Sequence, residues 1–69
     1  MSRKNQVLEQ AEKFIEQGRK PSATSISQEL SWTEEDVHRC LTLLEREGKI
    51  ETYPLNGMGK RMRMVSVFR

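Results

Sequence analysis

The sequence predicts a small, mainly α-helical α+β domain in which three helices are followed by a C-terminal β-hairpin. Apolar residues recur at helical spacing in three segments between residues 4 and 47, and capping residues and glycines mark the ends of these segments. After residue 49, β-type residues flank a glycine-containing turn, as in a hairpin. A chain of 69 residues, 35% of them hydrophobic, has room for one core, so residues 1–69 are predicted to form a single domain.

The first helix is predicted over residues 4–17. Gly18 suits the left-handed position that follows a helix, and Pro21 prevents the helix from continuing. Apolar residues spaced three and four apart would form its buried stripe. These are Val7, Leu8, Ala11, Phe14 and Ile15.

A second, shorter helix is predicted over Ala23–Leu30. Ser22 precedes it and can act as its N-cap, because a serine hydroxyl accepts a hydrogen bond from an unpaired amide of the first turn. The side expected to be buried repeats with helical spacing at Ala23, Ile26, Ser27 and Leu30.

A third helix is predicted to begin at Glu34, with Thr33 as its cap and Asp36 at the third helical position, in a variant of the capping box. Gly48 would end it, and Trp32 is expected to cover the junction with the preceding helix. The buried stripe of this third helix is predicted to be Val37, Cys40, Leu41 and Leu44.

The remaining residues predict a hairpin, with strands over 50–55 and 60–68 and a turn over 56–59. Pro54 lacks an amide hydrogen, so it is expected at the outer edge or the tip of its strand. Alternation along the second strand favours Met62, Met64 and Phe68 as its contribution to the core.

Two helices separated by about three residues have the form of a helix-turn-helix, and a hairpin after them makes a winged helix-turn-helix. In this fold the third helix is the one offered to the major groove of DNA. The candidate recognition residues lie opposite its buried stripe and are Glu35, His38, Arg39, Thr42 and Arg46. The alternative interpretation is the solvated face that every amphipathic helix has.

The third helix begins with three acidic residues, Glu34, Glu35 and Asp36. Their negative charges stabilise the helix by interacting with the positive end of its dipole, but they also repel phosphates that approach that end. We therefore expect this helix to enter a groove by its middle, or to bind DNA with the help of a partner.

Basic charge gathers near the C-terminus. Residues 1–55 carry eight basic and ten acidic side chains, a net charge of −2, whereas residues 56–69 carry four basic side chains and no acid, a net charge of +4. Lys60, Arg61 and Arg63 beside the predicted turn are candidates for contact with the DNA backbone or minor groove. The alternative is an edge strand protected from aggregation by its charges.

Other chemistry is not expected. His38 and Cys40 stand two apart on a helix and cannot share a metal ion, and no motif suggests catalysis or a bound cofactor, so we predict neither an enzyme nor a metal site. Cys40 is predicted to be a core residue rather than a redox sensor. One cysteine fits a reducing cytoplasm, no apolar run is long enough to cross a membrane, and a monomer is expected.

Three blocks of sequence resemble the FaeA/PapI-like family of small winged-helix regulators of fimbrial operons. The blocks are SATSISQEL (22–30), DVHRCLTLLEREGKI (36–50) and YPL (53–55) leading into GMG (57–59). The resemblance implies a transcription regulator that binds double-stranded DNA near a promoter and acts with a larger DNA-bound protein, such as the leucine-responsive regulatory protein. It also implies that the helix face and wing residues above form the DNA-binding surface.

A second function remains open on the sequence alone. A winged helix can serve as a protein-interaction module without binding DNA by itself. The residues that would make this contact are Tyr53, Met58, Met62 and the acidic start of the third helix.

Overall fold

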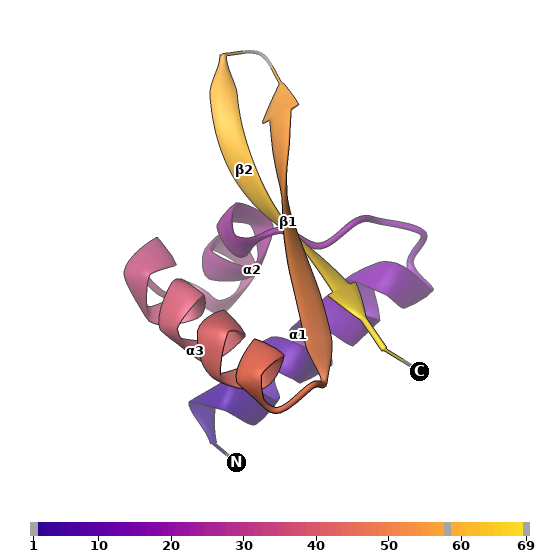
Figure 1. Ribbon diagram of the computed structural model, residues 1–69, viewed down its shortest axis with the longest axis vertical. Coiled ribbons are helices and arrows are strands. Elements are labelled where there is room, and N and C mark those ends of the chain that lie inside the picture. The colour runs from indigo at the N-terminus through magenta and orange to yellow at the C-terminus, as the bar shows by residue number, and fades with distance from the viewer. Residues whose placement is uncertain (1, 58, 69) are drawn as a thin grey trace.

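Three helices precede an antiparallel hairpin in the computed structural model, which describes residues 2–57 and 59–68 (Figure 1). The helices are α1 (Arg3–Glu16), α2 (Ala23–Leu30) and α3 (Glu34–Arg46), and the strands are β1 (Ile50–Gly57) and β2 (Lys60–Val67). This α+β arrangement has a winged-helix topology and confirms the predicted fold class. We call the hairpin of β1 and β2 the wing.

The ends of α1 lie within one residue of the prediction. Ser2 caps the helix, because its hydroxyl accepts a hydrogen bond from the Asn5 amide at 3.2 Å, and Gln17 is the last, half-helical residue. Gly18 and Gly48 follow α1 and α3 with φ angles of +76° and +74°. Both glycines therefore end helices in the left-handed conformation that the sequence predicts.

Both predicted caps of the helix-turn-helix are present. Ser22 accepts a hydrogen bond from the Ser25 amide at 3.1 Å, and the Ser25 hydroxyl in turn accepts one from the Ser22 amide at 2.9 Å. At the start of α3, the Thr33 hydroxyl accepts a hydrogen bond from the Asp36 amide at 3.2 Å. The cap of α2 is reciprocal, whereas at α3 the structure shows only the Thr33 half of the predicted capping box. Such side-chain caps satisfy amides that have no partner within the helix.

The corner between α2 and α3 is three residues long. Ser31 takes a left-handed conformation there, with φ of 58°, which turns the chain sharply after α2. Trp32 is partly buried against the core at this junction, as predicted, and the Arg3 guanidinium lies 5.7 Å from the centre of its ring.

The core lies where the three helices meet the base of the wing. The predicted stripe of α3 is fully confirmed, and α1 and α2 contribute most of the residues expected of them. Leu8 and Leu30 pack against the core from partly buried positions. The buried core residues are Val7, Ala11, Phe14, Ala23, Ile26, Val37, Cys40, Leu41, Leu44, Ile50 and Val65.

The wing is longer than predicted. Its register runs from Ile50 opposite Val67 to Gly57 opposite Lys60. Residues 56 and 57, which were predicted in the turn, therefore belong to β1. Met58 lies outside the described residues. Pro54 lies on β1, opposite Arg63 on β2. Among the described strands β1 pairs only with β2, so the proline lies on an edge strand, as expected.

The predicted core contribution of β2 is partly wrong. Phe68 is 56% exposed and Met62 is half-buried, whereas Met64 and Val65 are both buried. The segment before α2 pairs with the edge of β2 here: the Val65 amide donates to the Pro21 carbonyl at 2.9 Å, and Ser22 bridges to Met64. Met64 and Val65 are neighbours that alternation puts on opposite faces, yet both are buried, so alternation does not decide which side is buried.

The outer part of the wing stands clear of the helices, while α3 runs beside its base (Figure 1). Within residues 2–57 and 59–68, none of the helices has the length and apolar character needed to cross a bilayer.

Candidate nucleic-acid interface

The predicted recognition face of α3 is turned outward. Glu35 and Arg39 have side chains that are 76% and 72% exposed, and they form an ion pair across one helical turn with an N–O distance of 2.9 Å. Arg46 is exposed further along the same face. Thr42 is half-buried, and its hydroxyl donates to the His38 carbonyl at 3.0 Å. This face therefore offers one paired and one unpaired arginine among the described contacts.

The first turn of α3 is acidic, as the sequence indicates. Glu34 and Glu35 are exposed, and the Asp36 carboxylate lies 3.9 Å from the Arg3 guanidinium. A polyanion is repelled most strongly at this end of the helix. The middle of α3, around Arg39 and Thr42, lies away from this acidic end.

Two of the three predicted wing cations extend into solvent. Lys60 and Arg61 are exposed, and neither has an ionic partner within the described residues. Together with Asn56, Gly57 and Gly59 they line a shallow hollow near the tip of the wing. Their charges are therefore available to a partner.

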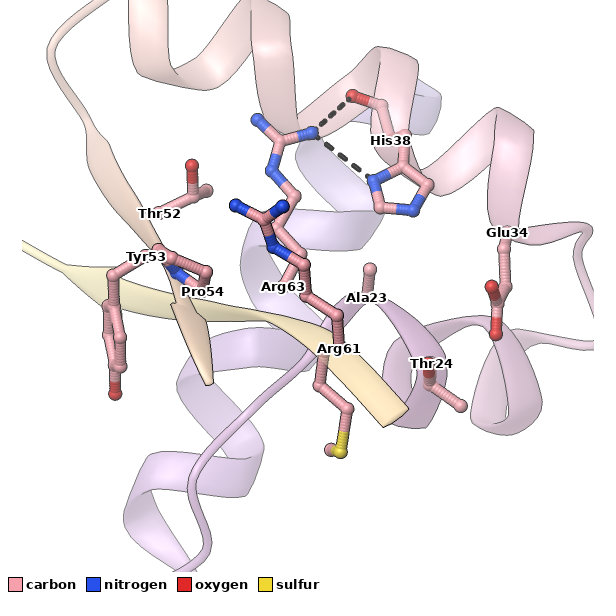
Figure 2. A pocket seen from close by; sticks show the side chains of 10 residues that line it. Ala23, Thr24, Glu34, His38, Thr52, Tyr53, Pro54, Arg61 and Arg63 are labelled. Atoms are coloured by element: carbon pink, nitrogen blue, oxygen red, sulfur yellow. Dashed lines mark hydrogen bonds between the residues drawn. The ribbon is translucent and has the colours of Figure 1, made fainter. Parts of the chain in front are cut away.

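The third predicted wing cation, Arg63, is directed inward. Its side chain is only 24% exposed. Its guanidinium donates to the His38 Nδ1 at 3.2 Å and to the His38 carbonyl at 3.3 Å, both on α3 (Figure 2). It also lies 3.3 Å from the Glu45 carboxylate. The structure thus places Arg63 between the wing and α3 and not on the outer surface of the wing.

Glu45 joins α3 to both strands. Its carboxylate accepts hydrogen bonds from the Thr52 hydroxyl at 3.0 Å and the Thr52 amide at 3.2 Å, besides the contact with Arg63. The hydrogen bonds from Thr52, supported by the positive charge of Arg63, hold the pKa of the Glu45 carboxyl below its usual range. The carboxylate is therefore the favoured form at the base of the wing.

A concave surface runs from α3 to the wing. One hollow of about 380 Å³ is lined by the start of α2, by α3 and by the wing (Figure 2), and a second hollow of about 470 Å³ lies along the outer face of α3. His38 lines both. The predicted residues of α3 and the wing are thereby brought to one side of the molecule, and Arg61 and Arg63 point from β2 toward α3.

Sequence reasoning missed Glu45 and Thr52. A signal for Glu45 was available, because His38, Thr42 and Glu45 recur four and three residues apart and therefore share one side of α3. No such signal exists for Thr52, since its contact with Glu45 depends on how the wing packs against the helix.

Other candidate chemistry is limited in the part of the chain that the structure describes. No group of three or more potential metal ligands comes together there. Cys40 is buried in the core, as predicted, and burial raises the pKa of its thiol. Of the residues suggested for protein contact, Tyr53 is 40% exposed and Met62 is half-buried, and Met58 falls outside the described ranges.

Taken together, the fold defines a protein of winged-helix topology with a concave surface between its third helix and its wing. Comparison with models of protein families, with curated proteins and with solved structures found no match for this chain. The resemblance to the FaeA/PapI-like regulators therefore stays a prediction.

Proposed function

We propose that this protein is a DNA-binding transcription regulator without enzymatic activity. In this proposal α3 enters the major groove with Arg39, His38 and Thr42 near the base edges, and the wing lies against the backbone or the minor groove. The FaeA/PapI-like resemblance of the sequence supports the same function and suggests a fimbrial operon as the target.

The observation that carries the proposal is that His38 borders two hollows, one along α3 and one beneath the wing. The helix face and the wing therefore border two adjoining hollows. A duplex is a convex polyanion whose major groove accepts a helix while its backbone passes alongside.

The distribution of charge supports an approach by the middle of α3 and the wing together. Arg39 and Arg46 extend from the helix, and Lys60 and Arg61 extend from the wing, while three of the four acids of α3 lie in its first turn. Few phosphates can be neutralised by so few cations, so binding by one copy is expected to be weak and strongly dependent on salt. A larger DNA-bound partner would compensate for this weakness.

Amide chemical-shift mapping with random-sequence duplex DNA at low and moderate salt tests the proposal. We expect shifts around Arg39 and around 60–61 at low salt, and smaller shifts when salt weakens the phosphate contacts. Arg61→Glu should weaken binding to every sequence. Lys20→Glu is a matched control, because Lys20 is also exposed but lies in the connection before α2 and lines neither hollow. Unmoved amides in both buffers would contradict the proposal.

A protein-interaction module is the second candidate function, and the exposed apolar residues of the wing favour it. Tyr53 is 40% exposed and Leu55 is 47% exposed, and their partners across the hairpin are Met64 and Met62. These side chains alternate with Arg61 and Arg63 and so occupy the opposite face of the wing. If this module is the true function, duplex DNA leaves the α3 amides unmoved and a purified partner protein shifts those of Tyr53 and Leu55.

A further inference from the structure

The wing needs an anchor to hold a fixed angle to α3. A two-stranded hairpin is only marginally stable by itself, and the described residues of the wing at 54–57 and 59–61 are exposed. A wing that bends freely would present Lys60 and Arg61 in many orientations relative to the helix.

The anchor is built on one side of α3. His38 and Glu45 lie two turns apart on that helix, and Arg63 reaches both of them from β2. Glu45 also accepts two hydrogen bonds from Thr52 on β1. One carboxylate and one guanidinium thus connect both strands of the wing to the helix.

The contact with His38 also selects one form of its ring. A guanidinium has only donors, so the Nδ1 atom at 3.2 Å must be the acceptor, and the proton of the neutral ring is then on Nε2. The ring lines the hollow between α3 and the wing. Arg63 therefore determines which nitrogen of His38 can donate a hydrogen bond to a ligand.

From these contacts we infer that Arg63 is a positioning residue of the proposed interface and not a phosphate contact. It holds the wing at a fixed angle to α3 and sets the tautomer of His38, while Arg61, two residues earlier on the same face of β2, supplies the charge that meets DNA. This inference rests on the proposed function, because it assigns separate roles to two arginines of the same site.

The salt dependence of duplex binding separates the two roles. Each phosphate contact that is lost reduces the slope of log K against log salt by about 0.9. Arg61→Ala should therefore weaken binding and flatten the slope by about that amount. Arg63→Ala should weaken binding with the slope unchanged. If one molecule in about ten then keeps the competent wing angle, Kd rises about tenfold.

Arg63→Lys is the decisive second variant, because it keeps the positive charge but has no planar group to bridge His38 and Glu45. We expect Arg63→Lys to bind duplex DNA as weakly as Arg63→Ala does. If Arg63→Lys binds like the original protein and Arg63→Ala flattens the slope, Arg63 is a phosphate contact and the inference is overturned. Thermal unfolding of each variant identifies any loss of affinity that comes only from unfolding.

The ring nitrogens of His38 provide a readout that does not require DNA. His38 is the single histidine of the sequence, so long-range proton–nitrogen correlation spectra report its tautomer without ambiguity. At mildly alkaline pH we expect the Nε2-protonated form, and a mixture of tautomers in Arg63→Ala. An unchanged tautomer in that variant overturns the inference. A protein with the expected tautomer that binds no duplex overturns the proposed function instead.

Discussion

The guanidinium of Arg39 lies 2.9 Å from the carboxylate of Glu35, one turn earlier on the exposed face of α3. Both side chains are largely exposed, and such pairs on a helix contribute only about 0.3–0.5 kcal/mol. Arg39 can therefore leave Glu35 at little cost when a better acceptor, such as a guanine edge, is offered. Glu35 then remains as a negative charge close to the approaching duplex.

Replacing Glu35 should strengthen DNA binding. At about 8 Å in water, a unit charge and a phosphate repel each other by about 0.5 kcal/mol, so Glu35→Gln should lower Kd about twofold. Fluorescence anisotropy with a random duplex at low salt measures this change. The matched control is Glu9→Gln, because Glu9 pairs with Lys13 over the same spacing but on α1. An equal gain in both variants would show that only net charge matters.

Removing Arg39 should change which sequences are preferred. A bidentate contact between arginine and guanine discriminates by about 1–3 kcal/mol, so Arg39→Ala should lose the preference at one base pair while Arg39→Lys retains part of it. Selection from a library of randomised duplexes measures the preference of each variant. Uniform weakening across all sequences would contradict a base-reading role for Arg39.

The contacts of Glu45 at the base of the wing should stabilise the fold less in acid. The pKa of Glu45 is held below its ordinary value of 4.5, first by the Thr52 hydroxyl, then by the Thr52 amide, with support from Arg63. The stability that this group contributes is therefore present above pH 4.5 and lost as the pH falls through the lower folded value. Glu45→Gln should lower the unfolding temperature at neutral pH, and the gap should shrink on acidification.

Thermal unfolding followed by circular dichroism over a range of pH measures the effect of Glu45→Gln. Glu29→Gln is the control, because Glu29 is exposed on α2 and has no ion pair among the described residues. A gap between Glu45→Gln and the original protein that stays constant well below pH 4.5 would rule out this role for the carboxylate.

The cap of α2 should be a measurable source of stability. Ser22→Ala removes the hydroxyl that accepts from the Ser25 amide and contacts the Ser25 hydroxyl. Loss of a serine cap costs about 1 kcal/mol, which lowers Tm by about 4–8 °C in a domain of this size. Ser66→Ala, at an exposed position of β2, should leave Tm nearly unchanged. Similar Tm values for the two variants would mean that the cap contributes little.

The thiol of Cys40 should be unreactive in the folded protein. Its side chain belongs to the core, and burial raises the pKa of the thiol above the ordinary value of 9.0. The charge of Arg3 lowers this pKa by a smaller amount, and the charge of Asp36 raises it. The folded state disfavours the thiolate, so the stability linked to this group is present below pH 9.0 and is lost as the pH rises through the folded value. A thiol-reactive disulfide reagent should modify it slowly, and rapidly in denaturant. Equal rates would place the thiol at the surface.

Much of the fold could be predicted because its signals are local. The caps Ser22 and Thr33 bond to residues three positions away, and Gly18 and Gly48 change the backbone where they stand. Helix boundaries therefore followed from neighbouring residues to within one position. The strand ends of the wing were predicted less accurately, because the position of its turn is set by the pairing of two strands and not by the turn residues themselves.

The amino-acid pattern alone predicts the three helices, the buried stripe of α3 and the excess of positive charge near the C-terminus. How that charge is divided between the solvent and the interior depends on the packing of the wing against α3. Arg61 and Arg63 look alike in the sequence, but Arg63 bonds to His38, 25 positions away, whereas Arg61 is exposed. The same holds for Val65, which packs into the hydrophobic core. Such partners are chosen by register and packing, which bring together residues that no local pattern relates.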